Sequence, residues 1–196
     1  MNAIRPSACG KQEAIGQTAR KEITVKYGEL DLGQVEAIVN KLGGMEGVHR
    51  LLSGRAEVTI VRHIIDCDVD PFTPDGWKVE EHKKGGQFEW GPAKVSLHLS
   101  PNQKDGKVIE GNKLRKELAR EPMLNANVLD YFLANQYLIP EEWKGKAVFF
   151  WGTIYRRSGG RLFVRCLYFD GGRWDWSCSW LDDDWDDIGP AARLAS

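Results

Sequence analysis

The chain has 196 residues, of which 42% are hydrophobic and 28% are charged, and its mean hydropathy is -0.43. This composition is typical of a folded globular protein and excludes an intrinsically disordered chain. The formal net charge of -1 and the isoelectric point near 6.4 exclude a global positive field, so neither nucleic acid nor an anionic membrane is expected as a partner.

Targeting signals and metal sites are not indicated by the sequence. The N-terminal residues contain no apolar run of signal-peptide length, and the strongest apolar run, AVFFW at 147–151, is too short to span a membrane. The cysteines Cys9, Cys67, Cys166 and Cys178 and the four histidines are scattered without metal-ligand spacing. We therefore expect no metal, no cofactor and a reduced compartment, cytoplasmic by default unless the chain belongs to a surface or viral assembly.

The N-terminal part predicts a short helical unit. Residues 1–22 are mixed and polar and are expected to form a poorly ordered lead-in, followed by a helical hairpin segment over 23–56. Within that segment, two apolar stripes over 31–42 and 45–52 have helical spacing and end in glycine, which favours helix C-termini. Its few basic residues are not clustered for contact with a DNA groove, so a packing unit is favoured over a DNA-reading or oligomerising element.

Three segments in the middle of the chain predict strands. EVTIVRHIID (57–66), WKVEEH (77–82) and QFEWGPAKVSLHLS (87–100) have β-branched or alternating apolar content. The sequence DCDVD, just after the first of them, is reminiscent of a calcium-binding loop. Pro71 stands where that loop requires glycine, and Trp77 stands where it requires glutamate, so a solvated turn is expected instead.

The second half predicts two helices and then a set of hairpins. NKLRKELAR (112–120) and PMLNANVLDYFLANQ (122–136) carry apolar stripes at helical spacing, and Pro122 suits a first helical turn. Beyond them, aromatic and β-branched runs are interrupted by SGG and DGG, which are signals of tight hairpins. Residues 57–196 are therefore expected to form one α+β domain.

The C-terminal residues 147–196 use a restricted set of amino acids. They contain no Lys, Glu, Gln, Met, Asn or His, and the stretch WDWSCSWLDDDWDD at 174–187 holds half of the eight tryptophans. In an extended strand, the period of two places Trp174, Trp176 and Trp180 on one face together with Cys178, and the small polar residues on the other. Buried tryptophans could hold this ribbon on a core whatever stands between them, so the intervening positions are free to vary.

The segment VFFWGTIYRRSGGRLFVRCLYFDGGRWDWSCSWLDDDWDDIGPAARLAS resembles the C-terminus of the variable proteins of diversity-generating retroelements. Those proteins commonly show the pattern RCLYWNxGRWNWNYNWLDNDWNxNNPAAxLAS. The resemblance implies a C-type lectin-like domain over 57–196. In that family a reverse transcriptase makes errors at adenines, so AAC codons for Asn scatter to residues such as Asp, Ser, Gly and Ile. A TGG codon for Trp contains no adenine and stays fixed.

The resemblance also implies which residues bind ligand and which form the scaffold. The diversified region would span 165–196, with a fixed scaffold of Trp174, Trp176, Trp180 and Trp185. The implied variable, ligand-binding residues are Phe169, Asp170, Asp175, Ser177, Cys178, Ser179, Asp183, Asp186, Asp187, Ile188 and Gly189. Most of them stand where the family has Asn, Cys178 stands where it often has Tyr, and Phe169 replaces a Trp. The expected partner is an unidentified macromolecule, with a protein favoured, and oligomerisation is left open.

Three other interpretations compete with this one. The Trp and Asp pattern could be only a packed core with an acidic rim. LDDDWDD at 181–187 could supply carboxylates and aromatic rings to a calcium-dependent carbohydrate-binding module. Cys166 and Cys178 could form a redox or catalytic pair, but no histidine follows position 98 to activate a thiolate, so we expect no enzymatic activity. The acidic character predicts a basic epitope and association that weakens with salt.

Overall fold

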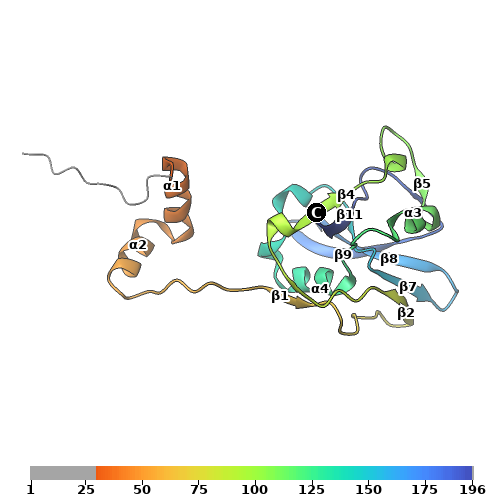
Figure 1. Cartoon of the computed structure of the whole chain (residues 1–196), viewed down its shortest axis with the longest axis horizontal. Helices are drawn as coiled ribbons and strands as arrows, with labels where there is room; N and C mark the ends of the chain where they lie inside the picture. Colours follow the sequence, from red (N-terminus) through yellow and green to blue (C-terminus); the bar gives the residue numbers. More distant parts are fainter. Residues whose placement is uncertain (1–29, 196) are drawn as a thin grey trace, which may run out of the picture. The chain divides into compact units, whose positions relative to one another are not determined.

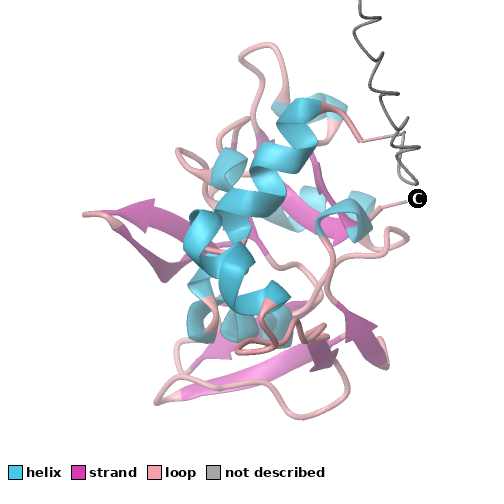
Figure 2. Cartoon of the chain, turned by 90° about the vertical axis from the view of Figure 1, so that its left-hand side faces the viewer, coloured by secondary structure: helices cyan, strands magenta, loops and turns pink. Residues whose placement is uncertain are grey.

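The computed structural model describes residues 30–195 and divides the chain into two units, one ending at Thr59 and one beginning at Ile60. The predicted lead-in over 1–22 and the first residues of the predicted helical segment lie outside the described residues. The second unit contains both helices and strands, so the protein has an α+β fold (Figure 1 and Figure 2). None of the helices in the described range is long and apolar enough to cross a membrane.

The first unit contains the two predicted helices, α1 (Leu32–Lys41) and α2 (Gly44–Leu52). Asp31 begins α1 with a capping box, because its carboxylate accepts a hydrogen bond from the Gln34 N–H at 2.7 Å and the Gln34 side chain accepts one from the Asp31 N–H at 3.0 Å. Gly43 has a φ of 84°, which ends α1 in the left-handed conformation that glycine adopts most readily. The two helices therefore lie where the two apolar stripes predicted them.

The second unit is built on a curled sheet in which β8 is central. The strand order is β2-β7-β8-β6-β11-β4. β7 and β6 pair with different parts of β8, and β9 pairs with β8 from Phe163 to Asp170. The strands of this sheet are β2 (Trp77–His82), β4 (Val95–His98), β6 (Val148–Phe149), β7 (Thr153–Arg157), β8 (Leu162–Asp170), β9 (Arg173–Trp180) and β11 (Ala191–Leu194). All pairs are antiparallel except β11 with β6, which is parallel. Since β9 has β8 as its one neighbour among the described strands, it is an edge strand.

Smaller elements complete the second unit. Two short antiparallel pairs join β1 (Ile64–Asp66) to β3 (Gln87–Glu89) and β5 (Ile109–Glu110) to β10 (Asp184–Trp185). The α-helices are α3 (Gly111–Leu118) and α4 (Ala126–Ala134), and single 3-10 turns lie at Pro92–Lys94, Pro101–Gln103, Gln136–Leu138 and Glu141–Trp143.

The β8–β9 hairpin follows from its turn residues. Gly171 and Gly172 have φ values of 56° and 83°, and a two-residue turn with both φ values positive has the twist that matches an antiparallel strand pair. Pairing then continues without a shift from Asp170 opposite Arg173 to Phe163 opposite Trp180. The DGG hairpin signal is confirmed, and SGG likewise lies in the turn between β7 and β8.

Two apolar clusters cover the two faces of β8. Leu167 belongs to the first cluster, in which α4 contributes Leu129 and Phe132. Its neighbour Cys166 belongs to the second cluster, to which α3 contributes Leu114. Because successive residues of a strand point to opposite faces, both faces of the sheet are buried around β8. The sheet therefore holds one helix against each face.

Two predicted boundaries were wrong. The strand expected over 57–66 forms only at Ile64–Asp66, because no described strand lies beside residues 57–63. The helix expected over 122–136 is α4, which begins at Ala126 and not near Pro122. The chain before it runs beside β11, since the Leu124 N–H donates to the Ala192 carbonyl at 3.0 Å. Asn125 then starts α4 as its N-cap.

A buried ion pair fixes α4 to β8. The Arg165 guanidinium donates two hydrogen bonds to the Asp130 carboxylate, at 2.7 and 3.1 Å, and the Arg165 side chain is 1% exposed while that of Asp130 is 30% exposed. The same guanidinium lies 4.4 Å from the centre of the Trp176 ring and 5.2 Å from that of Phe72. The pair therefore also supports the tryptophan side of β9.

Removing the carboxylate should show the importance of this pair. Asp130→Ala leaves the Arg165 charge buried and unpaired, and it is expected to lower the free energy of unfolding by about 3 kcal/mol or more. Urea denaturation measures the change. Glu80→Ala is the matched control, because Glu80 accepts two hydrogen bonds from Arg156 at a more exposed position, and it should have a much smaller effect. Equal effects of the two variants would contradict the structural role of the buried pair.

Candidate functional site

The polar residues of β9 lie on one face of this edge strand. Asp175, Ser177 and Ser179 pair across to Tyr168, Cys166 and Val164 of β8, and they point to the side of the second apolar cluster. Ser177 is exposed, while Asp175 and Ser179 are half-buried. The Asp175 carboxylate accepts a hydrogen bond from the Trp176 N–H at 2.8 Å, which places one side-chain acceptor on the edge of the strand. These three predicted residues therefore form one presented row.

The opposite face of β9 carries the tryptophans, and their burial decreases along the strand. Trp174 is buried in the first cluster, Trp176 is half-buried against Arg165, and Trp180 is 37% exposed. Trp180 still contacts Phe163, with ring centres 5.9 Å apart, and its ring lies 4.1 Å from the Arg161 guanidinium. Trp180 is more exposed than the alternation alone predicts, because it ends an edge strand.

Two predicted ligand-binding residues lie on the tryptophan side. Phe169 packs on Trp174 with a centroid distance of 5.3 Å and lies under the Lys144 ammonium at 4.3 Å. Cys178 pairs with Arg165 and shares its face with the tryptophans. The structure therefore does not bring Phe169 and Cys178 together with the polar row of β9. Asp170 stands apart from both groups, exposed at the β8–β9 turn.

Trp185 anchors the loop that follows β9. It is 4% exposed, its ring centre lies 4.2 Å from that of Phe149 and 4.8 Å from that of Trp151, and its Nε1 donates to the Trp180 carbonyl at 3.3 Å. The buried Gln103 amide holds the next part of the loop by donating to the carbonyl of Asp186 at 2.9 Å. The backbone of the loop is thus fixed by the buried side chains of Trp185 and Gln103.

The carboxylates of this loop are exposed, and the described residues offer them no cationic partner. We call Asp182, Asp183, Asp184, Asp186 and Asp187 the acidic loop; all five are exposed. Within residues 30–195, no Lys or Arg lies within ion-pair distance of any of them. The contacts that they do make are neutral: Asn112 donates to Asp182 at 2.9 Å, and the Ile188 N–H donates to Asp186 at 3.1 Å. The surface here is negative and uncompensated.

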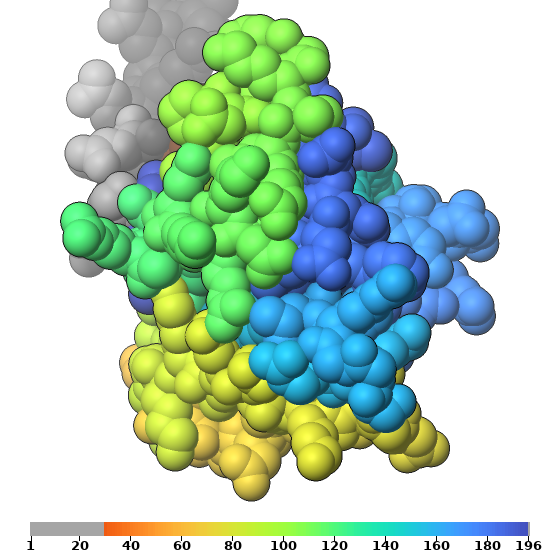
Figure 3. Space-filling view, turned by 90° about the vertical axis from the view of Figure 1, so that its right-hand side faces the viewer, coloured from red at the N-terminus to blue at the C-terminus, as the bar shows by residue number. Residues whose placement is uncertain are grey.

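The polar row and the acidic loop meet at a cavity of about 230 Å³. Its lining residues are Ala147, Phe149, Ser179, Asp183, Asp184, Trp185, Asp186, Ile188 and Gly189. Five of them belong to the predicted variable set, and the buried aromatic residues Phe149 and Trp185 are part of its apolar lining. Figure 3 shows the C-terminal segment, in blue, at the surface beside the green β5–α3 segment. The cavity therefore joins Ser179 of β9 to the predicted residues of the following loop.

Gly189 differs from the other predicted variable positions because it is buried. A Cβ atom placed there would lie 3.2 Å from Cε2 of Phe149, which is tighter than ordinary van der Waals contact. Asp187 and Ile188, in contrast, are exposed. Any larger residue at position 189 must therefore displace the Phe149 ring by a few tenths of an ångström, and sequence spacing gave no signal of this contact.

Burial raises the pKa of each described cysteine above the ordinary value of a thiol. Burial raises the pKa of Cys67 to about 11, with help from Asp68 and Asp66, and burial raises the pKa of Cys166 to about 12. Burial also raises the pKa of Cys178, although the nearby Arg157 and Arg165 oppose the effect. A nucleophilic thiol requires the opposite shift. Cys166 lies opposite Ser177, and Cys178 is the next residue along β9. Because successive side chains of a strand alternate, Cys166 and Cys178 point to opposite faces of the hairpin.

Metal ligands do not gather in the described part of the chain. Within residues 30–195, no group of three or more His, Cys, Asp and Glu side chains is arranged to hold a metal ion. The carboxylates of the acidic loop are dispersed by their outward orientation, and Trp185 separates Asp184 from Asp186.

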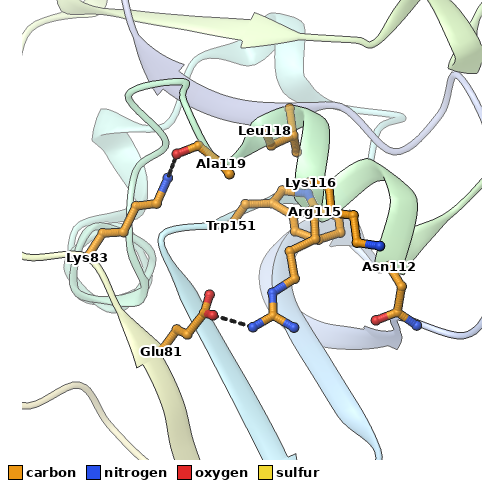
Figure 4. A pocket seen from close by; sticks show the side chains of 8 residues that line it. All are labelled: Glu81, Lys83, Asn112, Arg115, Lys116, Leu118, Ala119 and Trp151. Carbon is orange, nitrogen blue, oxygen red and sulfur yellow. Dashed lines mark hydrogen bonds and ion pairs between the residues drawn. The ribbon is translucent and has the colours of Figure 1, made fainter.

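A larger cavity of about 450 Å³ lies away from the predicted residues (Figure 4). Its lining residues are Glu81, Lys83, Asn112, Arg115, Lys116, Leu118, Ala119 and Trp151. Three of its four charged groups already have partners: Arg115 pairs with Glu81, and the Lys83 ammonium donates to the Ala119 carbonyl at 2.9 Å. The fourth, Lys116, is exposed and makes no ion pair within residues 30–195. Burial lowers the pKa of Lys83. These contacts tie the C-terminus of α3 to β2 and its following residue, which is a structural role.

Comparison with known proteins gives no family assignment. No protein-family model, no curated protein and no solved structure matches the chain.

Thiol titration tests the burial and pKa assignments. In a Cys9→Ser variant of the full chain, Ellman's reagent at pH 8 should leave Cys67 and Cys166 unmodified in the native state and react slowly with Cys178. The thiolate is the reactive form, so the rate at Cys178 should continue to rise as pH exceeds 9.0, the ordinary pKa of a thiol. Adding Cys178→Ser should abolish the native signal, whereas guanidinium should expose the remaining thiols. Rapid native modification of Cys166 would contradict its burial.

Proposed function

We propose that this chain is a ligand-binding variable protein, whose C-terminal surface is diversified by adenine-directed mutagenic reverse transcription as in diversity-generating retroelements. The observation that carries the proposal is a separation of residue types. Trp174 and Trp185, whose codon contains no adenine, are buried supports. Ser179, Asp183 and Asp186, which lie one or two adenine changes from AAC, line the cavity. We also propose a C-type lectin-like fold for 57–196, supported by the order of two helices followed by terminal hairpins.

The anchoring of the loop supports a binding role without enzymatic activity. Because Gln103 and Trp185 fix the backbone of the loop, little conformational freedom remains to be lost when a partner binds. Changes at the exposed positions can then alter the choice of partner without altering the frame. The raised pKa values of Cys166 and Cys178 favour binding over thiol chemistry.

The chemistry of the surface favours a protein partner with a basic side chain at its centre. The aliphatic part of a Lys or Arg side chain can lie against Phe149 and Trp185, while its charge meets the carboxylates of the acidic loop. Raising ionic strength from about 0.1 M to about 1 M shortens the screening length from about 10 Å to about 3 Å. Association with such a partner should slow accordingly, and a salt-independent association rate would exclude this epitope chemistry.

The native gene locus provides the decisive test of diversification. The expected result is a near-copy of the codons for about 165–196, close to a reverse transcriptase gene, that differs from this gene almost only where the copy has adenine. Such a repeat would identify the variable residues one by one. Its absence would overturn the proposal and leave a packed core with an acidic rim. A melting temperature that rises with calcium, together with calcium-dependent glycan binding, would favour the carbohydrate-binding alternative.

Stability measurements test the division into frame and variable positions. Ser177→Asn and Asp183→Asn restore the residues of the family pattern at exposed positions, and Asp187→Asn changes an exposed position at which that pattern is not fixed. Each should change the free energy of unfolding by no more than about 0.5 kcal/mol. Trp185→Ala removes a buried ring from the second cluster and should cost about 3–5 kcal/mol. Denaturant unfolding of the four variants measures both effects. A large loss in any Asn variant would show that its position belongs to the frame.

A further inference from the structure

The described part of the first unit, residues 30–59, contains almost no buried side chains. Gly47 is the one buried residue in α1 and α2, and four apolar residues of the two helices, Val39, Leu42, Val48 and Leu51, are only half-buried. The remaining large apolar side chains of this part of the chain are exposed: Leu30, Leu32, Val35, Ile38, Met45 and Leu52. Leu32 and Leu52 are 88% and 79% exposed, values that are unusual for leucine in a structured helix.

Helices of this length need a partner surface. α1 has 10 residues and α2 has 9, and isolated helices shorter than about 12–15 residues are marginal in water. Most of the stability of such helices in proteins comes from packing an amphipathic face. Six exposed aliphatic side chains offer several hundred Å² of apolar surface, which approaches the ~800 Å² that each partner contributes to a standard protein interface.

The segment after α2 has the character of an unpaired strand. EVTIVR at 57–62 is rich in β-branched residues, but no described strand pairs with it. Val58, Ile60 and Val61 are exposed, and Ile60 reaches 85%. Arg62 makes one long contact with Glu89, at 3.8 Å between largely exposed side chains, which leaves it available.

The same segment is complementary to itself. If two copies pair antiparallel about a two-fold axis between Thr59 and Ile60, Glu57 of each copy faces Arg62 of the other, and Val58 faces Val61. Opposite charges and β-branched residues in directly opposed positions are the pairs that stabilise an antiparallel ladder. A parallel or shifted register loses the two Glu–Arg pairs. The charge pattern therefore favours a second copy of this chain over an unrelated protein.

We propose that residues 30–62 form the interface of a two-fold symmetric homodimer. The segments 57–62 pair antiparallel at the axis, and the exposed faces of α1 and α2 from both copies pack together as a four-helix arrangement. This inference does not rest on the ligand-binding proposal. Its consequence for function is that each dimer carries two acidic loops, so weak contacts with a repeated partner gain from effective concentration.

Sedimentation equilibrium of the full chain tests the proposal. Over about 1–100 µM, the expected species is a dimer of twice the 22.1 kDa chain mass. Leu32→Asp combined with Leu52→Asp should give a monomer. Val69→Asp combined with Val108→Asp places the same charges at exposed valines of the second unit and should leave the dimer intact. A monomeric parent chain, or a trimer or larger assembly, would overturn the two-fold interface.

Charge exchange tests the register independently of helix stability. Glu57→Arg places two pairs of like charges at the axis and should weaken dimerisation by at least about tenfold, and the same holds for Arg62→Glu. The double variant exchanges the two charges and should restore the parent dissociation constant. Near-ultraviolet circular dichroism of each variant should match that of the parent, which verifies that the second unit is folded. Failure of the double variant to recover would overturn the antiparallel register.

Discussion

The unbroken pairing of β8 with β9 is the constraint on which the arrangement of the surface depends. From Phe163 opposite Trp180 to Asp170 opposite Arg173, the register never shifts, and the two-residue glycine turn leaves no slack for another register. Because side chains alternate along a strand, this register alone sends the tryptophans to the Arg165 side and the serines to the other. A slip by one residue would exchange the two sets and remove the tryptophans from the Arg165 side.

The backbone of the loop after β9 is also held in place, but mainly by side-chain contacts and not by strand pairing. Strand pairing is short there, since β10 has two residues, and the loop relies on the Trp185 ring, the Gln103 amide and the close approach of Gly189 to Phe149. Each of these contacts holds backbone or aromatic groups and leaves the aspartate side chains free. A surface fixed in this way can change its chemistry by substitution while its shape is preserved.

The sequence predicted local structure more accurately than it predicted which segments pack against one another. The DGG turn and the helical stripes of the first unit carry their own conformational signals, so those elements were predicted correctly. Alternation also predicted which face of β9 would carry the tryptophans. It could not predict that Trp180 lies at an exposed strand end, since burial depends on which distant segment covers a face. The same reason explains the shortened strand at 57–66, whose residues favour β structure but have no described partner.

The site residues show the same limit. The tryptophan spacing indicated the acidic loop and the polar row of β9, and the cavity does join Ser179 to Asp183 and Asp186. Phe149 and Gln103 gave no signal, because neither is near the loop in sequence and neither has a residue type that marks a site. The alternation along β9 predicted Cys178 on the tryptophan face, where the structure has it. The family motif grouped Cys178 and Phe169 with the ligand-binding residues, but both lie on the tryptophan side and not beside the polar row.

The distribution of ion pairs gives the acidic loop its significance. Some carboxylates elsewhere in the second unit pair with arginines, such as Glu80 with Arg156 at 2.6 Å and Glu121 with Arg193 at 2.7 Å. Five ionised aspartates within six residues repel one another. The acidic loop has no cationic partner among the described residues, so its charge raises the free energy of the isolated protein. A binding partner that supplies the missing positive charge would recover that free energy, which is the physical argument behind the proposal that this surface binds a ligand.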